Sequence, residues 1–166
     1  MVEIPLYAPS GSGEHVYVTL ERRGVTTRDV SRALGRLFGL REVDIGQAGL
    51  KDQRSIATQT FSLHAHQLAP EEAARRIEGE LGWRVLSAAR HANKLRTGHL
   101  IGNRFELCLR RVHADAPARA AAIAAELVRH GWPNFFGAQR FGSKGDNALR
   151  GARGESPTAR ARLRSR

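Results

Sequence analysis

Residues 15–39 read HVYVTLERRGVTTRDVSRALGRLFG, and the fold is decided in this stretch. Apolar and polar residues alternate over His15–Arg22, which is the period of a half-buried β-strand. The period then changes to that of one apolar helical face, which comprises Val30, Ala33, Leu34, Leu37 and Phe38. Thr26 or Thr27 suits the N-cap of this helix, and Gly39 suits its end. The stretch therefore predicts a strand that leads directly into an amphipathic helix.

The patterns on the C-terminal side of this unit predict further strands and helices. We expect a short strand near 44–48, strands over Ile56–Leu63, Trp83–Ala89 and Phe105–Val112, and helices over Pro70–Leu81 and Pro117–His130. Strands and helices mixed in this order are typical of an α+β fold. The prediction is a mixed, mostly antiparallel sheet with helices on one face.

The composition is that of a chain that can fold around one core. A domain of about 150 residues buries roughly 68–70% of its unfolded surface, and this chain has 166 residues, 41% of them hydrophobic, with the single cysteine Cys108. Disulfides or a structural metal are therefore not needed to explain folding. No apolar run approaches the roughly 18 residues of a membrane span, and no secretory pattern opens the chain. We expect a soluble cytoplasmic protein that does not bind membranes.

The chain carries a large excess of positive charge. It has 27 Lys and Arg against 16 Asp and Glu, a net charge of +11, which favours a polyanionic partner, most often nucleic acid. A GC-rich genome would also enrich arginine, which makes up 24 of the 27 basic residues. Residues 140–166 hold eight basic and two acidic residues and few large apolar ones. We expect this end to be disordered, or helical only against a partner, because it cannot build a core of its own.

Three segments hold more polar, glycine and aromatic residues than packing requires. In the first, residues 48–54 (AGLKDQR), Asp52 lies between Lys51 and Arg54. Nearby positive charge favours the ionised form of a carboxylate, so the segment offers a candidate catalytic group. The alternative interpretation is a surface ion pair in a turn.

The second segment, residues 91–105 (HANKLRTGHLIGNRF), is rich in basic residues and glycine. Such a loop can contact phosphates through guanidinium groups and backbone amides, and the alternative is a solvated hairpin. The third segment, residues 131–142 (GWPNFFGAQRFG), places aromatic residues beside glycine and asparagine, outside any helical or strand period. Its aromatic rings could stack on an extruded base. The alternative is a buried loop whose aromatic side chains pack in the hydrophobic core.

Together these segments resemble the signature blocks of the TruD family of tRNA pseudouridine synthases. The blocks that carry the resemblance are Gly49–Asp52, His91–Phe105, Asn134–Gly142 and the N-terminal residues 5–15. The resemblance extends from Val2 to Asn147, in order and without large gaps. It implies a pseudouridine synthase-like catalytic domain and tRNA as the partner.

The resemblance also implies a reaction. Enzymes of this family convert a uridine of tRNA, typically uridine 13, into pseudouridine. The glycosidic C–N bond breaks, the base turns while it stays bound, and it is rejoined through carbon, so that substrate and product are isomers. This stoichiometry demands no cofactor and no metal, and the sequence offers no P-loop and no metal-ligand cluster.

The site residues implied by the resemblance follow its motifs. Asp52 corresponds to the essential aspartate, Asn134 helps to hold it, and Phe136 stacks on the target base. Asp52 would act as a nucleophile or remove a proton from the sugar, and the residues do not choose between these roles. Flipping a uridine out of folded tRNA costs a few kcal/mol, which stacking and phosphate contacts offset. The predicted RNA-binding residues are Lys51, Arg54, His91, Lys94, Arg96, Asn103, Arg104 and Arg140.

Members of the resembled family are usually much longer than this chain. We therefore expect a partial catalytic domain over residues 1–147 and a basic, disordered tail over residues 148–166. A sheet without its later strands exposes unpaired edges, so a complementing chain or self-association is an expected partner. The alternative function is a catalytically silent tRNA-binding or RNA-chaperone fragment. A metal-dependent nuclease would need clustered carboxylates, and none accompanies Asp52 in its motif.

Overall fold

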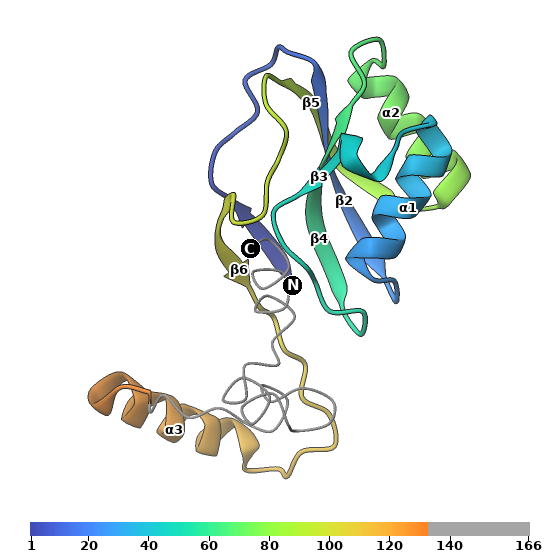
Figure 1. Ribbon diagram of the computed structural model, residues 1–166. Helices are drawn as coiled ribbons and strands as arrows, with labels where there is room; N and C mark the ends of the chain where they lie inside the picture. Colours follow the sequence, from blue (N-terminus) through green and yellow to red (C-terminus); the bar gives the residue numbers. More distant parts are fainter. Residues whose placement is uncertain (133–166) are drawn as a thin grey trace, which may run out of the picture. The chain divides into compact units, whose positions relative to one another are not determined.

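The computed structural model describes residues 1–132, which belong to two compact units divided after Cys108 (Figure 1). The first unit is built on a six-stranded sheet with the strand order β5-β2-β4-β1-β6, in which β3 also pairs with β4. The strands are β1 (Val2–Pro5), β2 (His15–Arg23), β3 (Ile45–Gln47), β4 (Ile56–His64), β5 (Arg84–His91) and β6 (Leu100–Arg104). Among the described strands, β1 and β4 are parallel and the other four pairings are antiparallel. The predicted mixed, mostly antiparallel sheet is confirmed.

Two helices cover one face of this sheet, as the sequence predicts (Figure 1). They are α1 (Thr27–Phe38) and α2 (Pro70–Arg76), and α2 continues into a π-helical turn over Ile77–Leu81. The buried core between helices and sheet consists of Val16, Val18, Leu20, Val30, Leu34, Ile45, Phe61, Leu63, Ala73 and Ile77. The α+β architecture therefore follows from burying two amphipathic helices on one sheet face.

The boundaries of α1 are set by local chemistry. The Thr26 hydroxyl accepts a hydrogen bond of 3.1 Å from the Asp29 amide, which makes Thr26 the N-cap. Gly39 ends the helix with φ of 65°, in the left-handed region that favours glycine. Of the two expected N-cap candidates, Thr27 instead becomes the first helical residue and is buried. Its hydroxyl is thereby free for tertiary contacts.

The second unit contributes α3 (Ala116–His130), in agreement with the helix predicted over Pro117–His130. None of the described helices is long and apolar enough to cross a membrane.

One expectation about strands was wrong, and two strands, β1 and β6, were not expected. The strand predicted over Phe105–Val112 is absent, and β6 ends at Arg104 instead. Phe105 and Leu107 have the alternating period of a strand but are 61% and 80% exposed. A strand requires hydrogen-bonding partners as well as a period, and no pairing of these residues is formed within the described part of the chain. The four-residue β1 was missed because it is too short to display a period.

One glycine allows the segment after β5 to cross the sheet. A Cβ atom on Gly46 of β3 would collide with the carbonyl oxygen of Leu95 and the hydroxyl of Ser62. The Leu95 amide donates to that hydroxyl at 3.0 Å. The absence of a side chain at Gly46 therefore brings residues 93–99 directly onto the sheet.

Replacement of Gly46 by Ala should lower the free energy of unfolding by about 1–3 kcal/mol, because backbone must move to make room for the methyl group. Urea denaturation would measure the loss. Gly102→Ala in β6 is the matched control, since a Cβ there meets nothing within 4 Å, and its effect should stay within about 0.5 kcal/mol. Equal effects of the two substitutions would contradict the close approach.

Candidate functional site

Asp52 lies in the loop that joins β3 to β4. The buried guanidinium group of Arg22 donates hydrogen bonds to the backbone of this loop. Arg22 is 1% exposed and projects from β2 on the helix-covered face. It donates to the carbonyl oxygens of Lys51 at 3.2 Å and Asp52 at 3.3 Å, and also to that of Val25. Burial lowers the pKa of Arg22, and the negative charge of Asp52 opposes this shift. The loop backbone is thus anchored to the centre of the sheet.

A second anchor comes from Thr27 at the start of α1 and Gln59 of β4. The Thr27 hydroxyl accepts from the Lys51 amide at 2.9 Å and donates to the Gln59 carbonyl oxygen at 3.0 Å. The Gln59 amide in turn donates to the Gly49 carbonyl oxygen at 2.7 Å. Both side chains are at most 1% exposed. Thr27 and Gln59 thus fix the backbone at Gly49 and Lys51 through hydrogen bonds in which their own polar groups are paired.

Lys51 was predicted to bind RNA, but its side chain is buried. Its ammonium group lies 2.6 Å from a carboxylate oxygen of Glu3 in β1, and the two side chains are 1% and 2% exposed. The other Glu3 oxygen accepts from the Thr60 amide at 3.2 Å. A buried, paired ammonium group is not presented to an RNA phosphate. Lys51 instead connects the loop to β1.

The Asp52 side chain is exposed and lines a groove of about 720 Å³ in the first unit. We call this the Asp52 groove, and its lining residues are Met1, Val2, Glu21, Asp52, Arg54, Ser55, Ile56, Thr58, Phe105, Glu106, Leu107 and Cys108. Arg54 lies in the same groove and is exposed, so its guanidinium group is accessible to a ligand. The groove thus combines one candidate catalytic carboxylate, a cation and an exposed aromatic ring, Phe105.

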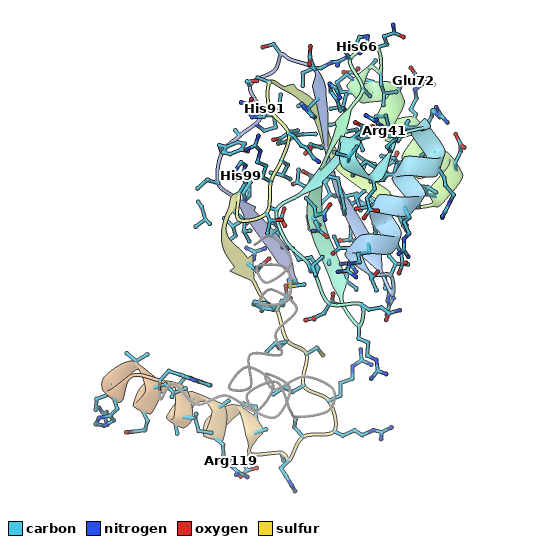
Figure 2. All side chains as sticks on the ribbon, viewed as in Figure 1. Arg41, His66, Glu72, His91, His99 and Arg119 are labelled. Atoms are coloured by element: carbon cyan, nitrogen blue, oxygen red, sulfur yellow. The ribbon has the colours of Figure 1, made fainter. Side chains whose placement is uncertain are left out.

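Three of the predicted RNA-binding residues meet in a second pocket, of about 490 Å³. We call it the Tyr7 pocket, and it is lined by Tyr7, Ala8, His91, Asn93, Lys94, Arg96 and His99. Figure 2 places His91 and His99 on the side of the sheet away from α1 and α2. The Lys94 ammonium group also donates to the Val43 carbonyl oxygen at 2.6 Å.

The remaining predicted residues are placed elsewhere. Asn103 and Arg104 lie in the edge strand β6, opposite Glu3 and Val2 of β1, and line neither of these cavities. Arg104 is exposed, and the next residue in the sequence, Phe105, lines the Asp52 groove. The expected catalytic residues Asn134 and Phe136, and the expected RNA contact Arg140, lie outside the described residues.

Several residues of the site were missed by sequence reasoning. Arg22 had a signal, because it continues the inward-facing series of Val16, Val18 and Leu20, where a cation is out of place. Glu3 had none, since a carboxylate in so short a strand has no pattern around it. Thr27 was interpreted as a candidate helix cap, so its hydrogen bonds with Lys51 and Gln59 were not predicted.

A family model described as tRNA pseudouridine synthase D (TruD) matches residues 1–151. The protein named tRNA pseudouridine synthase D of Geobacter metallireducens is 53% identical over 150 residues, which is 90% of this chain and 36% of that protein. Its namesake in an Anaeromyxobacter species is 48% identical and covers 99% of this chain and 46% of its own length. The chain therefore spans less than half of these relatives.

The solved structures include a similar fold. The crystal structure of the putative tRNA pseudouridine synthase D from Methanosarcina mazei superposes with a TM-score of 0.70 at 30% identity, over 86% of this chain and 32% of that one. The resemblance of the Gly49–Asp52 and His91–Phe105 blocks, the match over residues 1–151 and the shared fold agree with one another. This chain belongs to the TruD family.

Proposed function

We propose that this chain carries the catalytic aspartate of a tRNA pseudouridine synthase and isomerises uridine, typically uridine 13, to pseudouridine in tRNA. The observation that carries the proposal is the geometry of the loop around Asp52. Arg22, Thr27 and Gln59 immobilise the loop backbone, yet the Asp52 carboxylate is exposed in a groove of about 720 Å³. Rigid support beneath an accessible functional group is what positions a catalytic residue.

The chemistry requires one ionised carboxylate. In the isomerisation the N1–C1′ bond of uridine breaks and a C5–C1′ bond forms, while the proton leaves C5 and N1 gains one. Asp52 can attack the sugar or the base, or it can take a proton from the sugar. Both routes use its charged form. The reaction is balanced without a cofactor, a redox partner or a metal, and we propose none.

Stacking and phosphate contacts would offset the cost of extruding the uridine. We propose that the phosphate contacts come from the exposed Arg54, Arg96 and Arg104 together with Lys94 and His91. The polar Asn103 remains a candidate RNA contact on β6. For Asn134, Phe136 and Arg140, the proposed roles rest on the resemblance of their motif.

The chain spans 36% and 46% of the lengths of the two relatives above. That it isomerises uridine without the rest of such a protein is therefore also a proposal. We retain the division into a partial catalytic domain over residues 1–147 and a basic tail over 148–166, acting in the cytoplasm. A complementing chain or self-association would supply strands beyond β6. The second candidate function is a tRNA-binding fragment without catalysis, which the same basic surface would support.

Asp52→Asn should abolish isomerisation and leave tRNA affinity within about threefold, because it removes charge and nucleophilicity but little volume. The measurement is pseudouridine mapping on an unmodified tRNA transcript incubated with the chain, alongside a binding titration.

Asp29→Asn is the matched control, since Asp29 is an exposed aspartate at the start of α1. Turnover retained by Asp52→Asn would refute the catalytic role. Tight tRNA binding by the wild-type chain with no product would favour the binding fragment.

Glu3→Gln should lower the free energy of unfolding by about 3–5 kcal/mol, because it leaves the Lys51 ammonium group buried without its counter-charge. The double variant Glu3→Leu with Lys51→Met removes both charges and should recover most of this loss. Urea denaturation would give both values.

Glu80→Gln is the control for this comparison. It breaks the exposed ion pair between Arg76 and Glu80, at 3.0 Å, and should cost less than about 1 kcal/mol. A double variant as unstable as Glu3→Gln would show that the pair does not act as a unit.

If Lys94, Arg96 and Arg104 contact phosphates, their joint replacement by Ala should flatten the dependence of log affinity for tRNA on log salt. Each lost contact changes the slope by roughly 0.7–0.9, so we expect a change of about 2–3. The effect should be similar for different tRNA sequences, since phosphate contacts do not specify sequence.

Two controls accompany this titration. Joint replacement of Arg28, Arg36 and Arg75, which are exposed on α1 and α2, should leave the slope near its wild-type value. A chain ending at Asn147 should bind any RNA more weakly but still discriminate tRNA from unstructured RNA. If the truncation removes all salt dependence while the triple variant behaves as wild type, the basic loop is not the RNA-binding surface.

A further inference from the structure

The Tyr7 pocket and the Asp52 groove have no lining residue in common. The two cavities are therefore lined by different side chains, and the Asp52 carboxylate is not part of the Tyr7 pocket. Phosphate contacts alone would not fill this concave site. Its volume of about 490 Å³ falls in the range of pockets that take small organic ligands.

Aromatic rings build one wall of the pocket. The rings of Tyr7 and His91 are stacked, with centroids 5.1 Å apart and 18° between their planes. His99 meets Tyr7 edge-on at 5.7 Å, and its Nδ1 atom lies 2.7 Å from the Tyr7 hydroxyl. Behind them Tyr17 contacts His91 at 4.7 Å and donates its hydroxyl to the Asn93 carbonyl oxygen at 2.9 Å. Ring contacts and hydrogen bonds therefore hold this wall in place before any ligand arrives.

The hydrogen bonds leave donors available to a ligand. The Ser10 amide donates to Nδ1 of His91 at 3.1 Å, so neutral His91 carries its proton on Nε2. Burial and the hydrogen bond with Tyr7 raise the pKa of Tyr17, so this hydroxyl remains neutral. No Asp or Glu is among the lining residues, and neither Lys94 nor Arg96 forms an ion pair within the described residues. The pocket thus presents two cations and imidazole donors to an anion.

We infer that the Tyr7 pocket binds one nucleotide of the RNA other than the uridine that is isomerised. Arg96 and Lys94, with the imidazole of His99, hold its phosphate, and the Tyr7 ring packs against its base or ribose. The shared chemistry is that of a nucleoside monophosphate. That this monophosphate belongs to RNA rests on the proposed function.

The test uses uridine monophosphate, uridine and inorganic phosphate as separate probes, followed by NMR chemical shifts of the full chain. Uridine monophosphate should shift the resonances of the Tyr7 pocket at lower concentration than either of the other two. Asp52→Asn should leave this titration unchanged, which separates the pocket from the catalytic group. Equal titrations by phosphate and uridine monophosphate would reduce the site to an anion site and overturn the assignment of a nucleotide.

Variants then connect the pocket to tRNA. Tyr7→Ala and His99→Ala should each weaken tRNA binding at least fivefold, and Tyr7→Phe, which keeps the ring, should stay within twofold. Ala8→Trp fills the pocket from an exposed loop position and should weaken binding as much as Tyr7→Ala, without a change to buried packing. His66→Ala is the control, because His66 is exposed and lies apart from His91 and His99 (Figure 2).

The outcomes separate this inference from the proposed function. If tRNA binds and Ala8→Trp has no effect, the inference is wrong while the proposed function stands. If uridine monophosphate binds in the pocket but tRNA does not bind the chain, the ligand is a free nucleotide, and both the RNA assignment and the proposed function fail.

Discussion

The contacts of one buried guanidinium group determine where the candidate catalytic residue lies. Arg22 reaches from β2 to carbonyl oxygens of Val25, Lys51 and Asp52, and so connects the start of α1 with the loop after β3. A guanidinium group offers five donors in a fixed plane, which suits it to several carbonyl acceptors at once. A hydrophobic side chain at this position would leave the carbonyl oxygens without these partners. Burial of the Arg22 charge costs free energy. Its hydrogen bonds to the carbonyl oxygens in return fix the geometry of the loop.

Two layers of support with different chemistry meet at this loop. On the helix-covered face the support is a set of hydrogen bonds from Arg22, Thr27 and Gln59. On the side of β1 it is the ion pair of Glu3 with Lys51. The two residues of the Lys51–Asp52 dipeptide are consequently used in opposite ways, since one side chain is buried and paired and the other is exposed. The Lys–Asp element of this chain thus combines a buried lysine that stabilises the loop with an exposed aspartate, the proposed catalytic residue.

The sequence was sufficient to predict the parts of the fold that depend on local patterns. The helix after β2 has an apolar face, a hydroxyl cap and a terminal glycine, and all three act as expected. The strand expected over Phe105–Val112 was wrong because alternation cannot reveal whether a partner strand is present. Asp52 was found through its motif, whereas the placement of Lys51 depends on Glu3, 48 positions away. The contact between Tyr7 and His99 was not predicted either, because it joins segments that are 92 residues apart in the sequence.

The short strand β1 also has a consequence for the order in which the molecule assembles. Its partners are β4 and β6, so its hydrogen bonds join residues 1–5 to residues 56–58 and 100–104. Such contacts close long loops, and the entropy of closure must be met before they contribute stability. By contrast, β2 and α1 adjoin in sequence, so the packing of Leu20 and Val30 in the same core closes only a short loop. A chain still emerging from the ribosome therefore cannot complete the pairing of β1 before β6 has been synthesised.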